Sequence, residues 1–211
     1  MLDIKVALET IGLISKWVAN ILAERRSEQE KKDAQLLAET GKLLISLRAL
    51  DNTIHSLVGQ LTLFDLDWPL TRRNELIAEI NDFAHREEII TIIRQVLRQL
   101  PQLWAGAKEE DWKLSLEIYG CGTDLLRTLS DSPVTPFPDT DALREFAMRI
   151  KKAENQADVE AVIAKSEVIL NILDRKRLAA ADEVFGRMKG QILARHPKLP
   201  NPNWGYKDHQ L

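Results

Sequence analysis

The amino-terminal segment is apolar around most of its predicted helical surface. Across residues 4–22, the charged residues together with Gly12 and Asn20 recur every three or four residues and fall within a strip about 80° wide. These positions are Lys5, Glu9, Gly12, Lys16 and Asn20. Such a helix is not stable alone in water, so we expect its own chain to surround it at the centre of a bundle. The alternative is that it enters a partner or a membrane.

A second apolar series, over residues 36–64, steps by alternating threes and fours, with Thr40 in one position. This is a heptad seam, as in a coiled coil, but additional apolar residues widen it and favour a multi-helix bundle. The polar residues 23–35 precede it without any Gly or Pro. Within them, Ser27 and Glu30 have the spacing of a capping box, which predicts that a new helix begins near Ser27. One continuous helix is the alternative.

A third amphipathic series predicts one helix, capped by Thr71, with a core face from Leu76 to Leu100. A fourth predicts a helix that carries Trp112, Leu116, Tyr119, Leu126 and Leu129. Pro101 and Gly106 predict the turn between them. Gly120, Cys121 and Gly122 lie within the fourth series. They predict either an interruption of that helix or a close approach by another backbone, with Cys121 as a small residue at a tight helix contact.

No segment alternates apolar and polar residues for long enough to predict a strand. We therefore expect an all-α fold, an antiparallel bundle of roughly five to seven helices with no sheet. Residues 1–130 are expected to form the main bundle, and the proline-rich residues 131–140 a linker. Helices within 141–196 are expected to pack on the bundle, and 197–211 to form an irregular tail with prolines and aromatic residues.

Composition narrows the choice of function classes. The net charge of −3 gives no reason to expect nucleic acid as a partner. A single cysteine, Cys121, excludes an intrachain disulfide and a Cys-based zinc site, and it favours a reducing, cytoplasmic location. Charges at Lys5, Glu9 and Lys16 argue against a signal peptide, and no uncharged stretch reaches the ~18 residues of a membrane span.

Arg48 and His55 are separated by six residues in the second predicted helix. The pair resembles the Arg-x(4–6)-His pattern of HEPN-type ribonucleases, which are helical bundles. In that family the Arg and His act on the RNA phosphate and the 2′-hydroxyl, so the resemblance implies RNA cleavage without a metal. It covers only residues 48–55, and Ala49 stands where the family usually has a polar residue. The alternative is a solvated helix face on which Asp51 pairs with Arg48 or His55.

The Gly-rich phosphate loop, HExxH and GxSxG motifs are missing from the sequence. We therefore expect a non-enzymatic adaptor, scaffold or regulatory module that binds another protein, or itself, through an apolar stripe. No cofactor, metal or small-molecule ligand is predicted. Trp204 and Tyr206 are candidate partner-binding residues. The alternative is that they dock back on their own bundle. A membrane-active effector is the alternative, with Leu13, Trp17 and Ile21 as the inserting side chains.

Overall fold

The computed structural model describes residues 4–63, 67–82, 85–131, 156–157, 160, 164 and 175–202. Within these residues the chain forms six helices and no strand, which confirms the predicted all-α fold for the described part. The helices are α1 (Ile4–Ala23), α2 (Glu28–Thr62), α3 (Leu70–Asp82), α4 (His85–Trp104), α5 (Glu109–Asp131) and α8 (Arg175–Arg195). The prediction of one helix from Thr71 to Leu100 is wrong, because this stretch is divided between α3 and α4.

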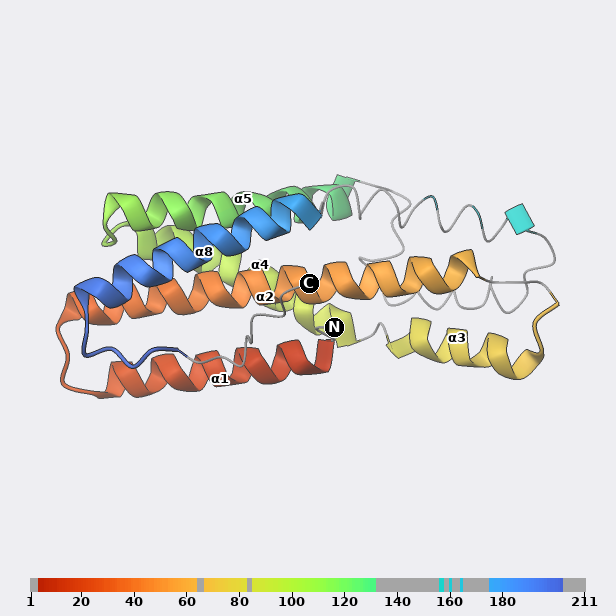
Figure 1. Ribbon diagram of the computed structural model, residues 1–211, viewed down its shortest axis with the longest axis horizontal. Helices are drawn as coiled ribbons and strands as arrows, with labels where there is room; N and C mark the ends of the chain where they lie inside the picture. The colour runs from red at the N-terminus through yellow and green to blue at the C-terminus, as the bar shows by residue number, and fades with distance from the viewer. Residues whose placement is uncertain are drawn as a thin grey trace.

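The central helix of the bundle is α2, which packs against α1, α4, α5 and α8 (Figure 1). It runs antiparallel to α1, α4 and α8, and α3 lies at the end of the molecule opposite the α1–α2 turn. The heptad seam explains the central position, because Leu36, Leu43, Leu47 and Leu50 are at most 1% exposed. Most flanking positions between residues 34 and 50 are also buried, so this stretch contacts neighbours on several sides. The seam therefore belongs to a multi-helix core.

Helix α1 lies at the periphery, so the prediction that its own chain surrounds it is wrong. It packs mainly on α2 and over a smaller area on α4. One face is buried, whereas Val6 is 43% exposed, Leu13 53% and Leu22 36%. A small bundle has one centre, and the apolar stretch of α2 occupies it. The outer face of α1 therefore carries its polar strip together with the apolar residues at the edges of that strip.

The turn between α1 and α2 is closed by the predicted capping box. The Ser27 backbone N–H donates to Glu30 Oε2 over 3.1 Å, and the Glu30 N–H donates to Ser27 Oγ over 3.2 Å. These bonds satisfy amide donors that have no partner in the first turn of a helix. The predicted helix start near Ser27 is thus confirmed, and the continuous helix is excluded.

Two details around α5 differ from the prediction: the place where the α4–α5 turn begins and the course of the helix at its glycines. Pro101 lies in the last turn of α4, so the turn begins only after Trp104. Helix α5 is not interrupted at its glycines; instead, a Cβ on Gly122 would lie 3.1 Å from side-chain atoms of both Leu43 and Leu97. The groups nearest to Gly122 are leucine side chains and not another backbone, and they pack α5 tightly against α2 and α4.

Candidate functional site

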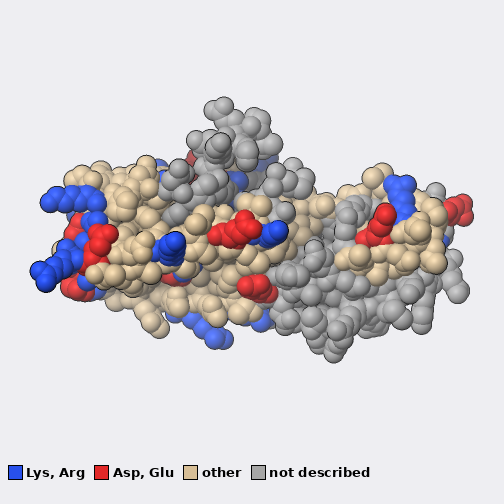
Figure 2. All heavy atoms as spheres, turned by 90° about the horizontal axis from the view of Figure 1, so that it is seen from below, with Lys and Arg blue, Asp and Glu red and all other residues tan. Residues whose placement is uncertain are grey.

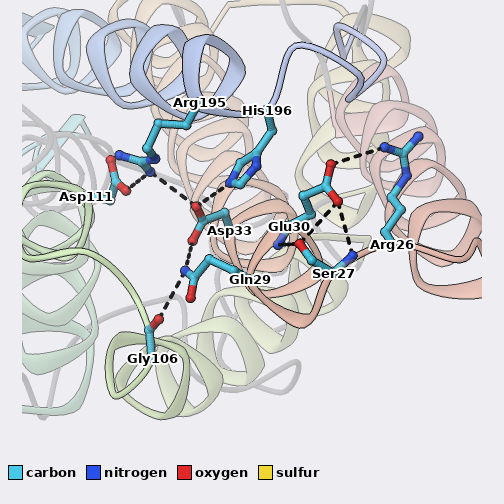
Figure 3. A network of polar contacts seen from close by, with 9 residues as sticks. All are labelled: Arg26, Ser27, Gln29, Glu30, Asp33, Gly106, Asp111, Arg195 and His196. Carbon is cyan, nitrogen blue, oxygen red and sulfur yellow. Dashed lines mark hydrogen bonds and ion pairs between the residues drawn. The ribbon is translucent and has the colours of Figure 1, made fainter.

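A buried polar network joins three helices at the end of the bundle that carries the α1–α2 turn (Figure 3). Its carboxylates come from Asp33 of α2 and Asp111 of α5, and both residues are fully buried. Arg195, the last residue of α8, contacts both: its Nη2 lies 3.3 Å from Asp33 Oδ2 and also donates to Asp111 Oδ2. His196 follows directly, with its Nε2 2.9 Å from Asp33 Oδ2. The network fixes the end of α8 against α2 and α5.

The same network reaches the α4–α5 turn through Gln29. Its Nε2 donates to Asp33 Oδ1 over 2.7 Å and to the carbonyl oxygen of Gly106 over 3.3 Å. Burial raises the pKa of Asp111 even though the contact with Arg195 acts in the opposite direction. Burial acts to lower the pKa of Arg195, but its bond to Asp111 and the two carboxylate charges outweigh this and raise it. Arg195 therefore stays charged, and the carboxylates hold helices together away from solvent.

The chain after α8 folds back along α1. Leu199 is buried, and its N–H donates to the carbonyl oxygen of His196 over 2.8 Å. Trp17 Nε1 donates to the carbonyl oxygen of Pro200 over 3.2 Å, and Lys189 Nζ donates to that of Pro202, also over 3.2 Å. Residues 196–202 thus dock on their own bundle. The predicted partner-binding residues, Trp204 and Tyr206, lie outside the described residues.

Three apolar residues of α1 form a stripe beside this docked segment, which we call the outer stripe: Val6, Leu13 and Trp17. At ~100° per residue they fall within an arc of about 40° on the helix. Val6 and Leu13 are exposed, whereas Trp17 is partly buried. Figure 2 views the molecule from the α1 side: charged side chains cluster at the end with the α1–α2 turn, and further Lys, Arg, Asp and Glu residues lie singly or in small groups along the rest of the coloured surface.

The membrane-insertion candidates do not share one surface. Leu13 faces outward, Trp17 contacts the C-terminal segment, and Ile21 is 1% exposed within the core. By length and composition, α1 is the one helix in the described part of the chain that is apolar enough to cross a bilayer. About a third of its most apolar window is buried, 33%.

Arg48 and His55 have different carboxylate partners. Arg48 Nη2 forms an ion pair with Asp182 Oδ2 of α8. The Nδ1 of His55 lies 3.0 Å from both the backbone oxygen and Oδ1 of Asp51, one turn earlier in α2. The Asp51–His55 pairing is one that the solvated-face interpretation predicts, whereas the pairing of Arg48 with α8 was not predicted.

Cys121 is a small buried residue in α5. Its Sγ donates to the carbonyl oxygen of Glu117 over 3.6 Å, and burial raises the pKa of the thiol. A thiol with a raised pKa is a poor nucleophile near neutral pH. This agrees with its predicted packing role.

Comparison with known proteins finds no matching family model, no similar curated protein and no similar solved structure. Across the described residues, no group of three or more His, Cys, Asp or Glu side chains is placed to hold a metal ion. Sequence reasoning missed the buried network because its members are far apart: Asp33 and Arg195 are 162 positions apart. No local spacing relates them.

Proposed function

We propose that this protein is a non-enzymatic helical-bundle module that works in the cytoplasm by binding another protein through the outer stripe of α1. The observation that carries the proposal is the exposure of Leu13, 53%, beside Val6, 43%, on the peripheral helix of the bundle. The two residues are seven positions apart, a spacing of two helical turns, which suits contact with an amphipathic helix of a partner.

The size of the stripe sets the expected strength of binding. Complete burial of a Val or Leu side chain contributes about 1.5–3 kcal/mol, so covering the exposed halves of Val6 and Leu13 contributes roughly 2 kcal/mol in total. That alone does not give a stable complex. The partner must also contact the polar residues beside the stripe, such as Glu9 and Lys16, which are exposed on the same outer face. A weak, reversible contact of this kind is typical of a regulatory module.

The test compares two substitutions at exposed leucines on different helices. Leu13→Glu changes the outer stripe, and Leu116→Glu changes α5, where Leu116 is 41% exposed. Proteins bound by the full chain are identified by photo-crosslinking from position 13, and their affinity for both variants is then measured. Loss of binding only with Leu13→Glu, at unchanged melting temperature, supports the proposal. Equal binding by both variants, or equal loss, contradicts it.

Membrane action is a second candidate because α1 has the length and hydropathy of a bilayer-spanning helix while only 33% of its apolar window is buried. Insertion requires α1 to leave α2, since Ile14 and Ile21 face the core. Dye release from vesicles of phosphatidylcholine and phosphatidylglycerol, measured between pH 4 and pH 8, tests this candidate. Release that is abolished by Leu13→Glu and retained by Leu116→Glu supports it. Absence of release throughout contradicts it.

A further inference from the structure

The surface on which the C-terminal segment docks contributes two hydrogen-bond donors from two helices. Trp17 Nε1 of α1 donates to the carbonyl oxygen of Pro200 over 3.2 Å, and Lys189 Nζ of α8 donates to that of Pro202 over 3.2 Å. Both helices pack on α2, and the segment turns back from the end of α8 and runs beside α1 (Figure 1). We call Trp17 and Lys189 the tail site. Its two bonds hold backbone carbonyls, so they do not require a polar side chain in the segment.

Two apolar side chains anchor the segment beside these bonds. Leu199 is 5% exposed and Pro202 is buried, whereas the other residues of 197–201 are exposed. The anchors are three positions apart, and each lies at or next to a bonded carbonyl. The contacts thus define a short recognition sequence, Leu-Pro-x-Pro, which is Leu199 to Pro202 in this chain.

Prolines suit the backbone of this segment to a site that donates hydrogen bonds. Three of the seven residues 196–202 are prolines, and proline has no backbone N–H that needs a partner when it is covered. The N–H of Leu199 is already bonded within the segment, to the carbonyl oxygen of His196 over 2.8 Å. Proteins that bind proline-rich segments place them against aromatic side chains, and the fixed φ of proline reduces the entropy lost on binding. Trp17 provides an aromatic ring and a donor together.

We propose that the tail site binds a Leu-Pro-x-Pro segment of a partner protein, and that residues 196–202 are the resident ligand that this segment displaces. The site is distinct from the contact of the proposed function, which rests on Val6 and Leu13. A resident ligand on the same chain has an effective concentration on the order of millimolar, so a free peptide competes only when its concentration approaches that value. The intact chain therefore binds the partner segment weakly until its own segment is released.

A peptide copy of residues 196–202 tests the site in the full chain. The peptide is amidated, labelled with fluorescein at its amino end, and followed by fluorescence anisotropy. Leu199→Asp in the chain removes one anchor of the resident segment and leaves the tail site in place, so this variant should bind the peptide at least ~10-fold more tightly than the native chain does. Leu116→Asp, at an exposed leucine of α5, should bind it as the native chain does. Equal affinity of the Leu199→Asp and native chains, or no binding by either, overturns the inference.

Two further changes identify the contacts of the bound peptide. Adding Trp17→Phe to the Leu199→Asp chain should weaken binding several-fold, because phenylalanine keeps an aromatic ring but has no N–H to donate. A peptide that itself carries Leu199→Asp should not bind. If either change leaves the affinity unaltered, the peptide lies on another surface and the inference is overturned.

The native chain allows a measurement that needs no substitution in it. Unlabelled peptide at about 10 mM should accelerate hydrogen exchange of the Leu199 amide several-fold, because it displaces the resident segment. The peptide with Leu199→Asp should leave this exchange rate unchanged. An exchange rate that does not respond to the native peptide overturns the inference. A native chain that sediments as a dimer, and becomes a monomer on Leu199→Asp, assigns the site to a second copy and overturns the assignment to a partner protein.

The outcomes separate this inference from the proposed function. Peptide binding by the Leu199→Asp chain should persist when Leu13→Glu is added, because Leu13 makes neither of the two bonds of the tail site. Peptide binding together with a crosslinked partner that is indifferent to Leu13→Glu keeps the tail site and removes the outer stripe as a binding surface. No peptide binding, together with a partner lost on Leu13→Glu, keeps the outer stripe and overturns the tail site.

Discussion

Replacing Arg195 with methionine leaves two fully buried carboxylates, Asp33 and Asp111, without the cation that contacts both. Removing one member of a buried ion pair destabilises a protein by about 3–5 kcal/mol. The Arg195 side chain is 19% exposed and His196 still contacts Asp33, so we expect the lower end, roughly 3 kcal/mol. Methionine keeps most of the side-chain volume, which separates the loss of charge from the loss of packing.

Helices α8 and α5, which carry Arg195 and Asp111, also provide a control ion pair. Arg177 of α8 pairs with Asp124 of α5 over 2.6 Å, but their side chains are 42% and 37% exposed. Arg177→Met should therefore lower the free energy of unfolding by no more than about 1 kcal/mol. Urea denaturation at pH 7, followed by circular dichroism at 222 nm, gives both values. Equal losses for the two variants would refute the reasoning that burial makes the Arg195 contacts strong.

The pH dependence of this network has a definite sign. Burial raises the pKa of Asp111 above its ordinary value of 3.8, so the folded state holds this proton to higher pH than the unfolded chain does. Its contribution to stability is therefore greatest below that value and declines as pH rises through the folded pKa. In Arg195→Met the opposing cation is gone, so the loss of stability should be smaller at pH 4 than at pH 7. A loss that grows on acidification would contradict this assignment.

Four other substitutions test separate parts of the structure. Ser27→Ala should lower the free energy of unfolding by about 1 kcal/mol, because it removes the side chain that caps α2. Ser56→Ala, on the exposed surface of α2, is the control, and chemical denaturation measures both variants. Gly12→Ala should raise the free energy of unfolding by up to about 1 kcal/mol, because a Cβ added there meets no other atom within 4 Å. Gly122→Ala should give no gain, because its added Cβ would lie 3.1 Å from a side-chain atom of Leu43. A larger gain for Gly122→Ala than for Gly12→Ala would contradict this packing. His55→Ala should leave the fold intact, and any metal-independent RNA cleavage that it abolishes would support the ribonuclease hypothesis.

Features of this fold that depend on residues close together in the sequence were predictable from it. The capping box at Ser27 and Glu30 is a three-residue spacing, and the buried leucines of α2 follow a heptad repeat. The position of α1 was not predictable in the same way. Its composition shows that it needs a neighbour, but which helix takes the centre depends on competition with α2, and a single segment carries no information about that competition. Leu13 is exposed to solvent because α2, and not α1, lies at the centre of the bundle.

His196 connects the buried network to the docked C-terminal segment, residues 196–202. Its ring contacts Asp33, while its carbonyl oxygen accepts the N–H of Leu199. The network thus fixes the point and direction from which residues 197–202 run back to Trp17. A polar cluster is expensive to bury, and an apolar contact at the end of α8 would hold the helices equally well. A directional set of hydrogen bonds additionally specifies the path of the chain that follows. This path is what brings the segment to the edge of α1 that the bundle leaves exposed.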